Sequence, residues 1–481
     1  MEVATIAMTG KACVIGSGPN GLAAAIVLAE AGLSVDIFEA EPTAGGAART
    51  LELTLPGFFH DFGSAVHPLA VGSPFFNRLP LQEYGLQWIH SPAVLAHPFD
   101  DGTAITLERD LRGAESALAE DGRVWCEMVE PFSSRWTEFA PEMLRPALAL
   151  PREPWLLARF GLLALIPTVT FVKRFRNPQT QALFGGLAAH SFLSLNERLS
   201  TAFGLILAIA GHAVGWPIPR GGAQSLTDAL QRHLGRFEVH LTTSHRVGDL
   251  ASLGAYDVML CDVTPQQLLA LGGKRLSPGY KRALRKFRSG PGIFKVDYAL
   301  NAPIPWNAVE CCRSATVHVG GSFAEIAAGE EEVQNQRHPE RPFVLLSQPT
   351  LFDPSRAPSG KHIAWCYCHV PNGSSFDMLP RIEAQIERFA PGFRDCILAR
   401  RVFSPASLEK MDCNLIGGDI SGGAVTMRQF LLRPTWRQYA TSSPGLFLCS
   451  SSTPPGGGVH GMCGYHAARA ALSRWKPSFR T

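Results

Sequence analysis

The chain of 481 residues is too long for one ordinary hydrophobic core, and its length predicts roughly two to three domains. Hydrophobic residues make up 46% of it and charged residues 18%, a globular composition that excludes extended disorder. The formal net charge of +3, from 44 basic and 41 acidic residues, gives no strong positive field, so we expect no nucleic acid partner.

The start of the chain and its cysteines indicate the compartment. Residues 1–10 lack the charged beginning and long apolar stretch of a secretory signal, so we expect a cytoplasmic protein. Eleven cysteines, an odd number without a CxxC pair, are typical of reduced thiols rather than of a disulfide framework. Cys366 and Cys368 fall in an alternating run that predicts a strand, and no second pair stands at zinc-site spacing. We therefore expect no bound metal.

A strand, a glycine turn, a helix and a second strand are predicted within the first 40 residues. Lys11–Ile15 is a short apolar run, Pro19–Ala31 has the apolar spacing of a helix, and Ser34–Glu39 is a strand that ends on an acid. Between the first strand and the helix, residues 16–21 (GSGPNG) match the GxGxxG pattern of a dinucleotide-binding turn. The sequence therefore predicts a βαβ nucleotide-binding unit.

The residues of this unit suit a bound dinucleotide. Gly16 permits a tight turn, Gly18 lets the backbone approach a pyrophosphate, and Gly21 allows the helix to pack closely on the strand. The pyrophosphate would then lie at a helix N-terminus, where free N–H groups and the helix dipole favour negative charge. Glu39 stands where an acid accepts hydrogen bonds from ribose hydroxyls, and its charge disfavours the 2′-phosphate of NADP.

FAD and NAD share this pattern, and other segments of the chain favour FAD. Gly45 and Gly46 form a second glycine turn, and Arg49 would neutralise the diphosphate. The turn at residues 60–67 is placed to reach the ring end of a long cofactor. Near the C-terminus, residues 453–471 form a glycine-rich loop followed by a helix, whose N-terminus would stabilise the negative charge that develops on a flavin during reduction.

The remaining elements fall into three groups. Two buried strands, Tyr256–Asp262 and Gly445–Cys449, are expected to pair with the first strand in one sheet. Residues 115–234 have helix-like apolar spacing interrupted by prolines, which predicts a helical insertion. An antiparallel sheet and a short amphipathic helix are expected from Ile293–Leu300, Ala315–Val319, Phe343–Ser347 and Ile363–Val370, and from Arg381–Phe389.

Two apolar stretches, Trp155–Val172 and Ala202–Val214, raise the question of a membrane. Arg159 and Pro167 interrupt the first, and the second is shorter than the roughly 20 apolar residues that a crossing needs, so we expect neither to span. They are predicted to be buried helices beside an apolar cavity, with contact to one membrane leaflet as the alternative. The basic run 281–288 is interpreted as a solvated helix face, with anionic lipid as its alternative partner.

With these motifs in place, the chain resembles the phytoene desaturase-like flavoproteins, within the broader amine oxidase and glutathione reductase-type FAD superfamily. The resemblance covers nearly the whole length and depends on residues 16–21, Glu39, the double glycine at 45–46, the FDxGS-like segment 61–64 and the segment 450–465. It implies that Val247 presents backbone to the adenine and that Thr264 lies near the dinucleotide. Amine oxidases of the superfamily have arginine directly after the double glycine, whereas this chain has Ala47, which argues against an amine oxidase.

The resemblance also implies a chemistry. Members of this family typically remove two hydrogens from a carbon–carbon bond of a lipophilic substrate and pass a hydride to flavin N5, while the protein positions the carbon and handles a proton. His67 and His460 are candidate catalytic residues because they fall in the loops expected near the flavin, and Arg220 is a candidate substrate contact. Each of the three has a structural role as its alternative.

Together these predictions define an α/β protein with a Rossmann-like FAD-binding domain made of residues 1–80, 221–290 and 425–481. Its discontinuous substrate domain is made of residues 81–220 and 291–424 and contains the antiparallel sheet and the helical insertion. The residues expected to bind FAD are Gly16, Gly18, Pro19, Asn20, Gly21, Glu39, Ala40, Gly45, Gly46, Ala47, Arg49, Gly63, Ser64, Val247, Thr264, Ser450, Val459, His460, Gly461 and Met462.

The substrate is expected to be a small hydrophobic molecule, carotenoid- or terpenoid-like. Only one predicted βαβ unit carries a GxGxxG pattern, at residues 16–21, so oxygen or a quinone is the expected electron acceptor, rather than a nicotinamide bound by a second domain. Three alternatives stay open: a redox-neutral isomerase that uses reduced flavin, an amine oxidase, and a non-catalytic lipid-binding escort of the same fold. The sequence does not specify an oligomeric state.

Overall fold

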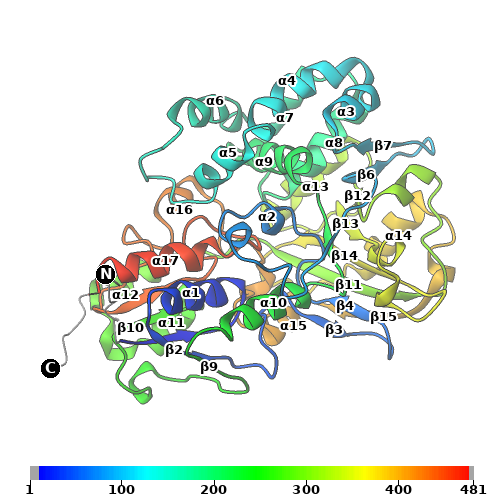
Figure 1. Ribbon diagram of the computed structural model, residues 1–481. Helices are drawn as coiled ribbons and strands as arrows, with labels where there is room; N and C mark the ends of the chain where they lie inside the picture. Colours follow the sequence, from blue (N-terminus) through cyan, green and yellow to red (C-terminus); the bar gives the residue numbers. More distant parts are fainter. Residues whose placement is uncertain (1–9, 476–481) are drawn as a thin grey trace.

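The computed structural model describes residues 10–475, so most of the expected non-secretory start at residues 1–10 lies outside it. The outer ends of the predicted segments 1–80 and 425–481 lie outside it as well. Figure 1 shows a lobe built on a parallel sheet, a second lobe built on a larger sheet, and a group of helices above both. The fold class predicted from the sequence is confirmed, with the correction to the second sheet given below.

The first lobe contains a five-stranded parallel sheet in the order β16-β10-β1-β2-β9. The predicted strands from three distant parts of the chain do pair side by side. Strand β9 was missed, because its exposed and half-buried residues alternate without a long apolar run. The strands are β1 (Lys11–Ile15), β2 (Ser34–Phe38), β9 (Val239–Thr242), β10 (Val258–Cys261) and β16 (Leu446–Leu448).

Helices cover both faces of this parallel sheet. On one face, α1 (Pro19–Glu30) packs against α10 (Gln224–Leu234) and α17 (Met462–Leu472). On the other face lie α11 (Pro265–Leu271) and α12 (Pro278–Leu284). The α1–α17 contact is very close, since a Cβ on Gly464 would lie 1.8 Å from the Asn20 carbonyl oxygen. The two ends of the chain are thereby joined beside the nucleotide-binding turn.

The second lobe contains a seven-stranded sheet in the order β15-β11-β14-β13-β12-β6-β7. The expectation of a purely antiparallel sheet is wrong, because β12 pairs with β6 in parallel. The four predicted strands are present, and β6, β7 and β15 were missed because they are short or alternate with charged residues. The strands are β6 (Leu95–Pro98), β7 (Ala104–Leu107), β11 (Gly292–Leu300), β12 (Thr316–Val319), β13 (Val344–Ser347), β14 (His362–Val370) and β15 (Ile397–Phe403).

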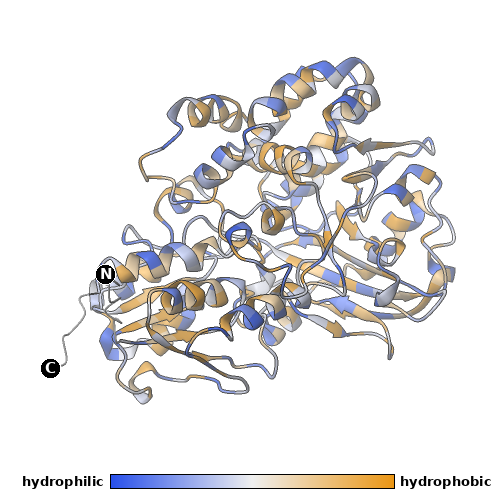
Figure 2. Cartoon of the chain, in the orientation of Figure 1, coloured by the Kyte–Doolittle hydropathy of each residue, from blue (hydrophilic) through white to orange (hydrophobic). Residues whose placement is uncertain are grey.

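One face of this mixed sheet packs on α14 (Leu379–Phe389), and the other faces the helical group. The helical insertion is present, and Figure 2 shows apolar residues along the strands of both sheets and along many of its helices. Helix α13 (Phe323–Gln334) was missed among the predicted strands and packs on α8. The helices of the insertion are α3 (Leu111–Ala117), α4 (Gly122–Ser133), α5 (Trp136–Met143), α6 (Pro154–Ala164), α7 (Thr168–Phe171), α8 (Pro178–Ala189) and α9 (Ser200–Ala213).

Short elements complete the fold. They are the pairs β3 (Thr50–Glu52) with β4 (Phe59–Asp61) and β5 (Trp88–Ile89) with β8 (Ile218–Pro219), and the helices α2 (Pro68–Val71), α15 (Pro405–Met411) and α16 (Met427–Leu432). Within residues 10–475, no single helix has both the length and the apolar composition to cross a membrane. Helix α6 and the segment Thr168–Arg174 meet those criteria only as a pair, with a bend of 90° between them.

Candidate functional site

A single cavity of about 920 Å³ connects the nucleotide-binding turn of the first lobe with the helical group and the mixed sheet. Among the residues predicted to bind cofactor or substrate, those that line it are Gly16, Gly18, Pro19, Asn20, Glu39, Ala40, Gly46, Ala47, Arg49, Gly63, Ser64, His67, Val247, Val459 and His460. Segments that are more than 400 residues apart in the chain therefore border one space.

The glycine turn at the start of α1 leaves backbone accessible to the cavity. Gly16 has φ +92°, which favours glycine, and a Cβ on Gly21 would lie 2.1 Å from the Gly16 carbonyl oxygen. A Cβ on Gly18 would approach an Asp262 carboxylate oxygen to 3.0 Å. The three glycines thus have the spatial roles that a dinucleotide turn requires, and the N-terminus of α1 suits a phosphate group.

Glu39 is fixed at the end of β2, beside this turn. Its carboxylate accepts hydrogen bonds from the Ser17 backbone N–H at 2.9 Å and the Ser17 hydroxyl at 2.6 Å, and from the Glu41 N–H at 2.9 Å. The side chain is buried yet borders the cavity. Since a carboxylate has about four lone-pair sites and three are used, one remains to accept a hydrogen bond from a ribose hydroxyl.

Asp262, at the end of β10, was not anticipated from the sequence. Its carboxylate accepts the Gly21 N–H at 2.9 Å, so it already occupies one donor in the first turn of α1. Burial, together with the nearby charges of Asp412 and Glu39, raises the pKa of Asp262 to about 7. An acid that is half protonated at neutral pH therefore stands at the place where a diphosphate would bind.

The second glycine turn lies against the first. A Cβ on Gly46 would lie 3.1 Å from the Gly18 Cα, so both turns approach closely. Arg49 borders the cavity, but its guanidinium donates to the Gly46 carbonyl at 2.7 Å and to the Met411 carbonyl at 3.0 Å. Its first role in the structure is to hold this turn on α15, while its charge remains next to the cavity.

His460 borders the cavity just before α17 begins. Its Nδ1 accepts the Met462 N–H at 3.0 Å, so the hydrogen of the neutral ring is on Nε2, which has no partner among the described residues. Burial lowers the pKa of His460 to about 4, and the ring is therefore neutral at pH 7. The predicted helix start is present, with Gly461 as N-cap at φ +68°.

His67 borders the same cavity from the loop before α2. Both of its ring nitrogens are buried without a partner within residues 10–475, and the ring lies 6.1 Å from that of Trp88 between centroids. Burial lowers its pKa to about 4. The two predicted histidines are thus brought to one space as neutral imidazoles.

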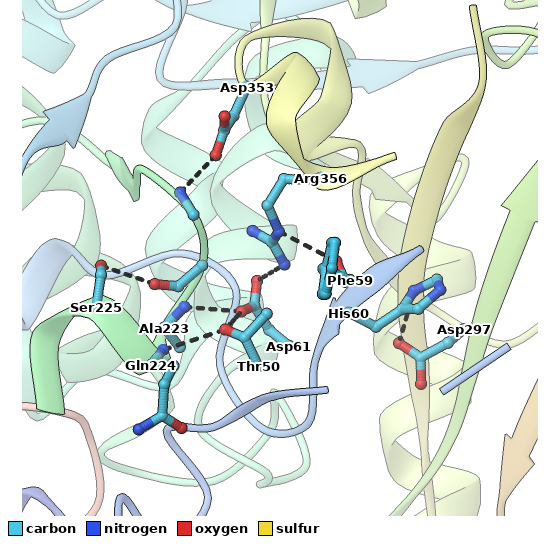
Figure 3. Close-up of polar contacts among 12 residues, drawn as sticks. Thr50, Phe59, His60, Asp61, Ala223, Gln224, Ser225, Asp297, Asp353 and Arg356 are labelled. Carbon is cyan, nitrogen blue, oxygen red and sulfur yellow. Dashed lines mark hydrogen bonds and ion pairs between the residues drawn. The ribbon is translucent and has the colours of Figure 1, made fainter. Parts of the chain in front are cut away.

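Arg220, the third predicted catalytic residue, has an exposed side chain and does not border the cavity. The turn that follows it is held by a polar network (Figure 3): Asp353 accepts the Gly221 N–H at 2.7 Å, and Asp61 accepts the Ala223 N–H at 2.8 Å. Arg356, itself buried, donates to Asp61 at 2.9 Å. This network fixes the loop that leads from Asp61 to His67, so its role is to position the cavity wall.

The other predicted residues lie just behind the cavity wall. Thr264 caps α11. Ser450 donates to the Val263 carbonyl at 2.7 Å and so connects the ends of β16 and β10. Gly21, Gly45, Gly461 and Met462 also stand outside the lining.

A buried charged group on β11 was also missed. The Lys295 ammonium bonds to Asp297, whose other oxygen lies 3.6 Å from Nδ1 of His60. Burial lowers the pKa of Lys295 and raises that of Asp297 to about 6. Lys295 Nζ is 5.8 Å from the ring of Trp365, which lines the cavity. No local sequence pattern marks these residues, since they meet only through sheet register.

Away from the nucleotide turn, the cavity wall is largely apolar and aromatic. Helices α6 and α9, the mixed sheet and α15 supply Phe160, Ala164, Ala202, Ile206, Leu207, Ile293, Leu345, Trp365, Tyr367 and Leu408. Such a wall suits a hydrophobic ligand.

Comparison with known proteins agrees with this geometry. Residues 14–79 match the model of the NAD(P)-binding Rossmann-like domain. The chain is 24% identical over 539 residues to pyridine nucleotide-disulfide oxidoreductase domain-containing protein 2 of Rattus norvegicus, covering 95% of this chain and 92% of that protein. It is 27% identical over 416 residues to a phytoene dehydrogenase of Streptomyces griseus, covering 80% of this chain and 77% of that protein.

Solved structures share the fold at low sequence identity. An oxidoreductase from Methanosarcina mazei has a TM-score of 0.65 at 15% identity, with 96% of this chain and 100% of that chain covered. A putrescine oxidase bound to putrescine has a TM-score of 0.61 at 16% identity, with 97% and 98% covered. The chain is accordingly an α/β protein with a Rossmann-like nucleotide-binding domain, and it is similar in sequence to a phytoene dehydrogenase and in fold to a putrescine oxidase.

Proposed function

We propose that the protein binds FAD and oxidises a largely apolar substrate, as a desaturase or dehydrogenase of a carotenoid- or terpenoid-like compound. The observation that carries this proposal is the single cavity, which is bordered at one end by the glycine turn and Glu39 and elsewhere by apolar side chains. The similarity to a phytoene dehydrogenase supports the same substrate class. When bound, FAD would supply the acceptor for a hydride from a substrate carbon.

Different segments of the chain would bind different parts of this cofactor. The start of α1 and Gly18 would bind the diphosphate, Glu39 the ribose hydroxyls, and Val247 the adenine. The N-terminus of α17 would lie at the ring, where its dipole favours negative charge.

The two histidines would lie beside the substrate. His460 offers an Nε2–H donor and His67 an unpaired ring, and both are neutral at pH 7, so His460 is suited to donate one hydrogen bond and His67 to accept or donate one, without carrying charge. The apolar wall would exclude water and orient the carbon chain. Oxygen or a quinone would then reoxidise the flavin.

Anaerobic titration of the purified protein tests this function. Addition of lipophilic polyenes is expected to bleach the oxidised-flavin absorption, whereas putrescine is expected to leave it unchanged. Bleaching by the amine with peroxide formation in air would show an amine oxidase. Conversion of the polyene without any electron acceptor would show an isomerase, and a protein that binds polyene but no flavin would be a lipid escort.

A pair of variants connects the test to the cavity. His460→Phe removes the Nε2–H donor beside the substrate space and is expected to slow the bleaching. The matched variant His466→Gln changes a histidine of α17 that contacts the Leu144 carbonyl and does not line the cavity, and it is expected to react at the normal rate. Equal rates for the two variants would contradict the role given to His460.

A further inference from the structure

Exposed apolar side chains concentrate in two segments of this protein, residues 144–165 and 425–437, which we call the rim. Within residues 10–475, fourteen large hydrophobic side chains are exposed, and nine of them lie in the rim: Leu148, Leu150, Trp155, Leu162, Leu165, Met427, Phe430, Leu432 and Trp436. Exposure is greatest at Leu150 (90%) and Trp155 (87%). Such a concentration of exposed apolar side chains marks an interaction site.

The rim surrounds an opening of the cavity. Leu165 and Phe430 come from its two segments, and each is both exposed to solvent and part of the cavity lining. Leu157 and Gly161 of α6 and Leu431 of α16 line the cavity next to them. In Figure 1, α6 and α16 lie on the same side of the molecule. A molecule that entered here would pass directly from the rim into the apolar part of the cavity.

Helix α6 is apolar on opposite faces. Leu156, Phe160 and Ala164 are buried against the insertion, while Trp155 and Leu162 point to solvent. Apart from Arg159, α6 is apolar all round, and such a helix is normally buried or in contact with a membrane. Because the inner face of α6 is already packed, the outer face needs a separate apolar partner.

The charge of the rim identifies that partner. The rim contains six arginines and only one acid, Glu153, so its formal charge of +5 exceeds the +3 of the whole chain. Arg152, Arg159, Arg428 and Arg437 are exposed, whereas Glu153 pairs with Arg135 at 2.9 Å. A two-fold contact between two copies would bring these arginines together without opposing acids, which disfavours self-association.

We propose that the rim docks on the surface of a membrane that contains anionic lipids, with its tryptophans and leucines in the interface and its arginines at the headgroups. Aromatic and aliphatic insertion together with basic charge is the combination that holds a protein on one leaflet. The cavity would then open toward the bilayer and receive a lipophilic molecule without passage through water. This inference depends on the exposure and charge of the rim, whatever reaction the cavity performs.

Vesicle sedimentation of the full chain tests the proposal. The protein is expected to sediment with phosphatidylcholine vesicles that contain phosphatidylglycerol, more weakly with phosphatidylcholine alone, and less as salt increases. The double variant Leu150→Ser with Trp155→Ser is expected to lower the partition coefficient by about tenfold. Val309→Ser is the matched control, because Val309 is 72% exposed outside the rim, and it is expected to bind as the unchanged protein does.

Two further measurements make the result decisive. The emission of Trp155, obtained by subtracting the spectrum of Trp155→Phe, is expected to shift to the blue when anionic vesicles are added. The protein without vesicles is expected to have the same mass in light scattering with or without the double substitution. Absence of sedimentation at low salt would overturn the proposal, and so would a dimer that the double substitution converts to monomer.

Discussion

Replacing Asp262 by asparagine is expected to remove a pH dependence from cofactor binding. The Asp262 carboxylate accepts the Gly21 N–H in the first turn of α1, where the diphosphate of FAD would bring further negative charge. Binding should therefore favour the protonated acid. Asparagine can still accept that N–H through its amide oxygen and carries no charge, so Asp262→Asn changes the electrostatics while it keeps the hydrogen bond.

The magnitude follows from the pKa of this acid, which rises from 3.8 to about 7 through burial and the charges of Asp412 and Glu39. Above pH 7 the FAD-free protein would have to take up one proton on binding, which weakens the affinity by up to about tenfold per pH unit. Below pH 7 the affinity should be flat. In the protein without FAD, the unfolded chain loses the Asp262 proton near pH 3.8, whereas the folded chain keeps it up to about pH 7. The free energy of unfolding therefore falls as the pH rises through this window, by roughly 4 kcal/mol in total.

The assay is titration of the flavin-free protein with FAD at pH 6 to 9, followed by quenching of flavin fluorescence. The unchanged protein is expected to lose affinity above pH 7, and Asp262→Asn is expected to bind equally well throughout. Glu30→Gln, at the opposite end of α1, is the matched control and should keep the pH dependence. The same slope in Asp262→Asn as in the unchanged protein would refute this reasoning.

Three other substitutions test neighbouring parts of the structure. Gly464→Ala should lower the melting temperature by several degrees, because its Cβ would meet the Asn20 carbonyl oxygen at 1.8 Å, whereas Gly279→Ala has open space and should not. Glu39→Arg should reduce FAD affinity by at least about tenfold in fluorescence titration, since it removes the acceptor for the ribose, and unchanged affinity would contradict that placement. Thr316→Val should raise the free energy of unfolding by about 1 kcal/mol in urea, because the buried Thr316 hydroxyl has no partner within residues 10–475, and a loss of stability would show that a partner exists.

Local patterns in the sequence were sufficient for the first lobe except for β9. The strand, turn and helix between Lys11 and Glu30 are adjacent in the chain, and each has its own signal, so their arrangement followed directly. The strands β10 and β16 were recognisable as short apolar runs. In the second lobe, β6 joins β12 in parallel across more than 200 residues, and no local pattern encodes such a pairing.

In the candidate site too, the sequence identified only residues that a local pattern marks. His67 and His460 could be selected because each stands in a glycine-rich or turn segment with its own signal, and both border the cavity. Arg220 was selected in the same way, but its side chain is exposed beside a turn that acids hold in place. Asp262 follows an ordinary strand and Lys295 lies within one, so no local pattern marks either residue. Only the folded arrangement shows that Asp262 accepts the Gly21 N–H of α1 and that Lys295 is buried with Asp297.

In the proposed function, one dinucleotide reaches from the start of α1 to the start of α17. The most direct measurement is the flavin content of the purified, folded protein, released by denaturation and quantified against the chain concentration. The proposed function predicts one FAD per chain, with the visible absorption of oxidised flavin before release and a strong loss of flavin in Gly18→Val. A folded protein that neither contains FAD nor binds it when FAD is added would contradict the claim.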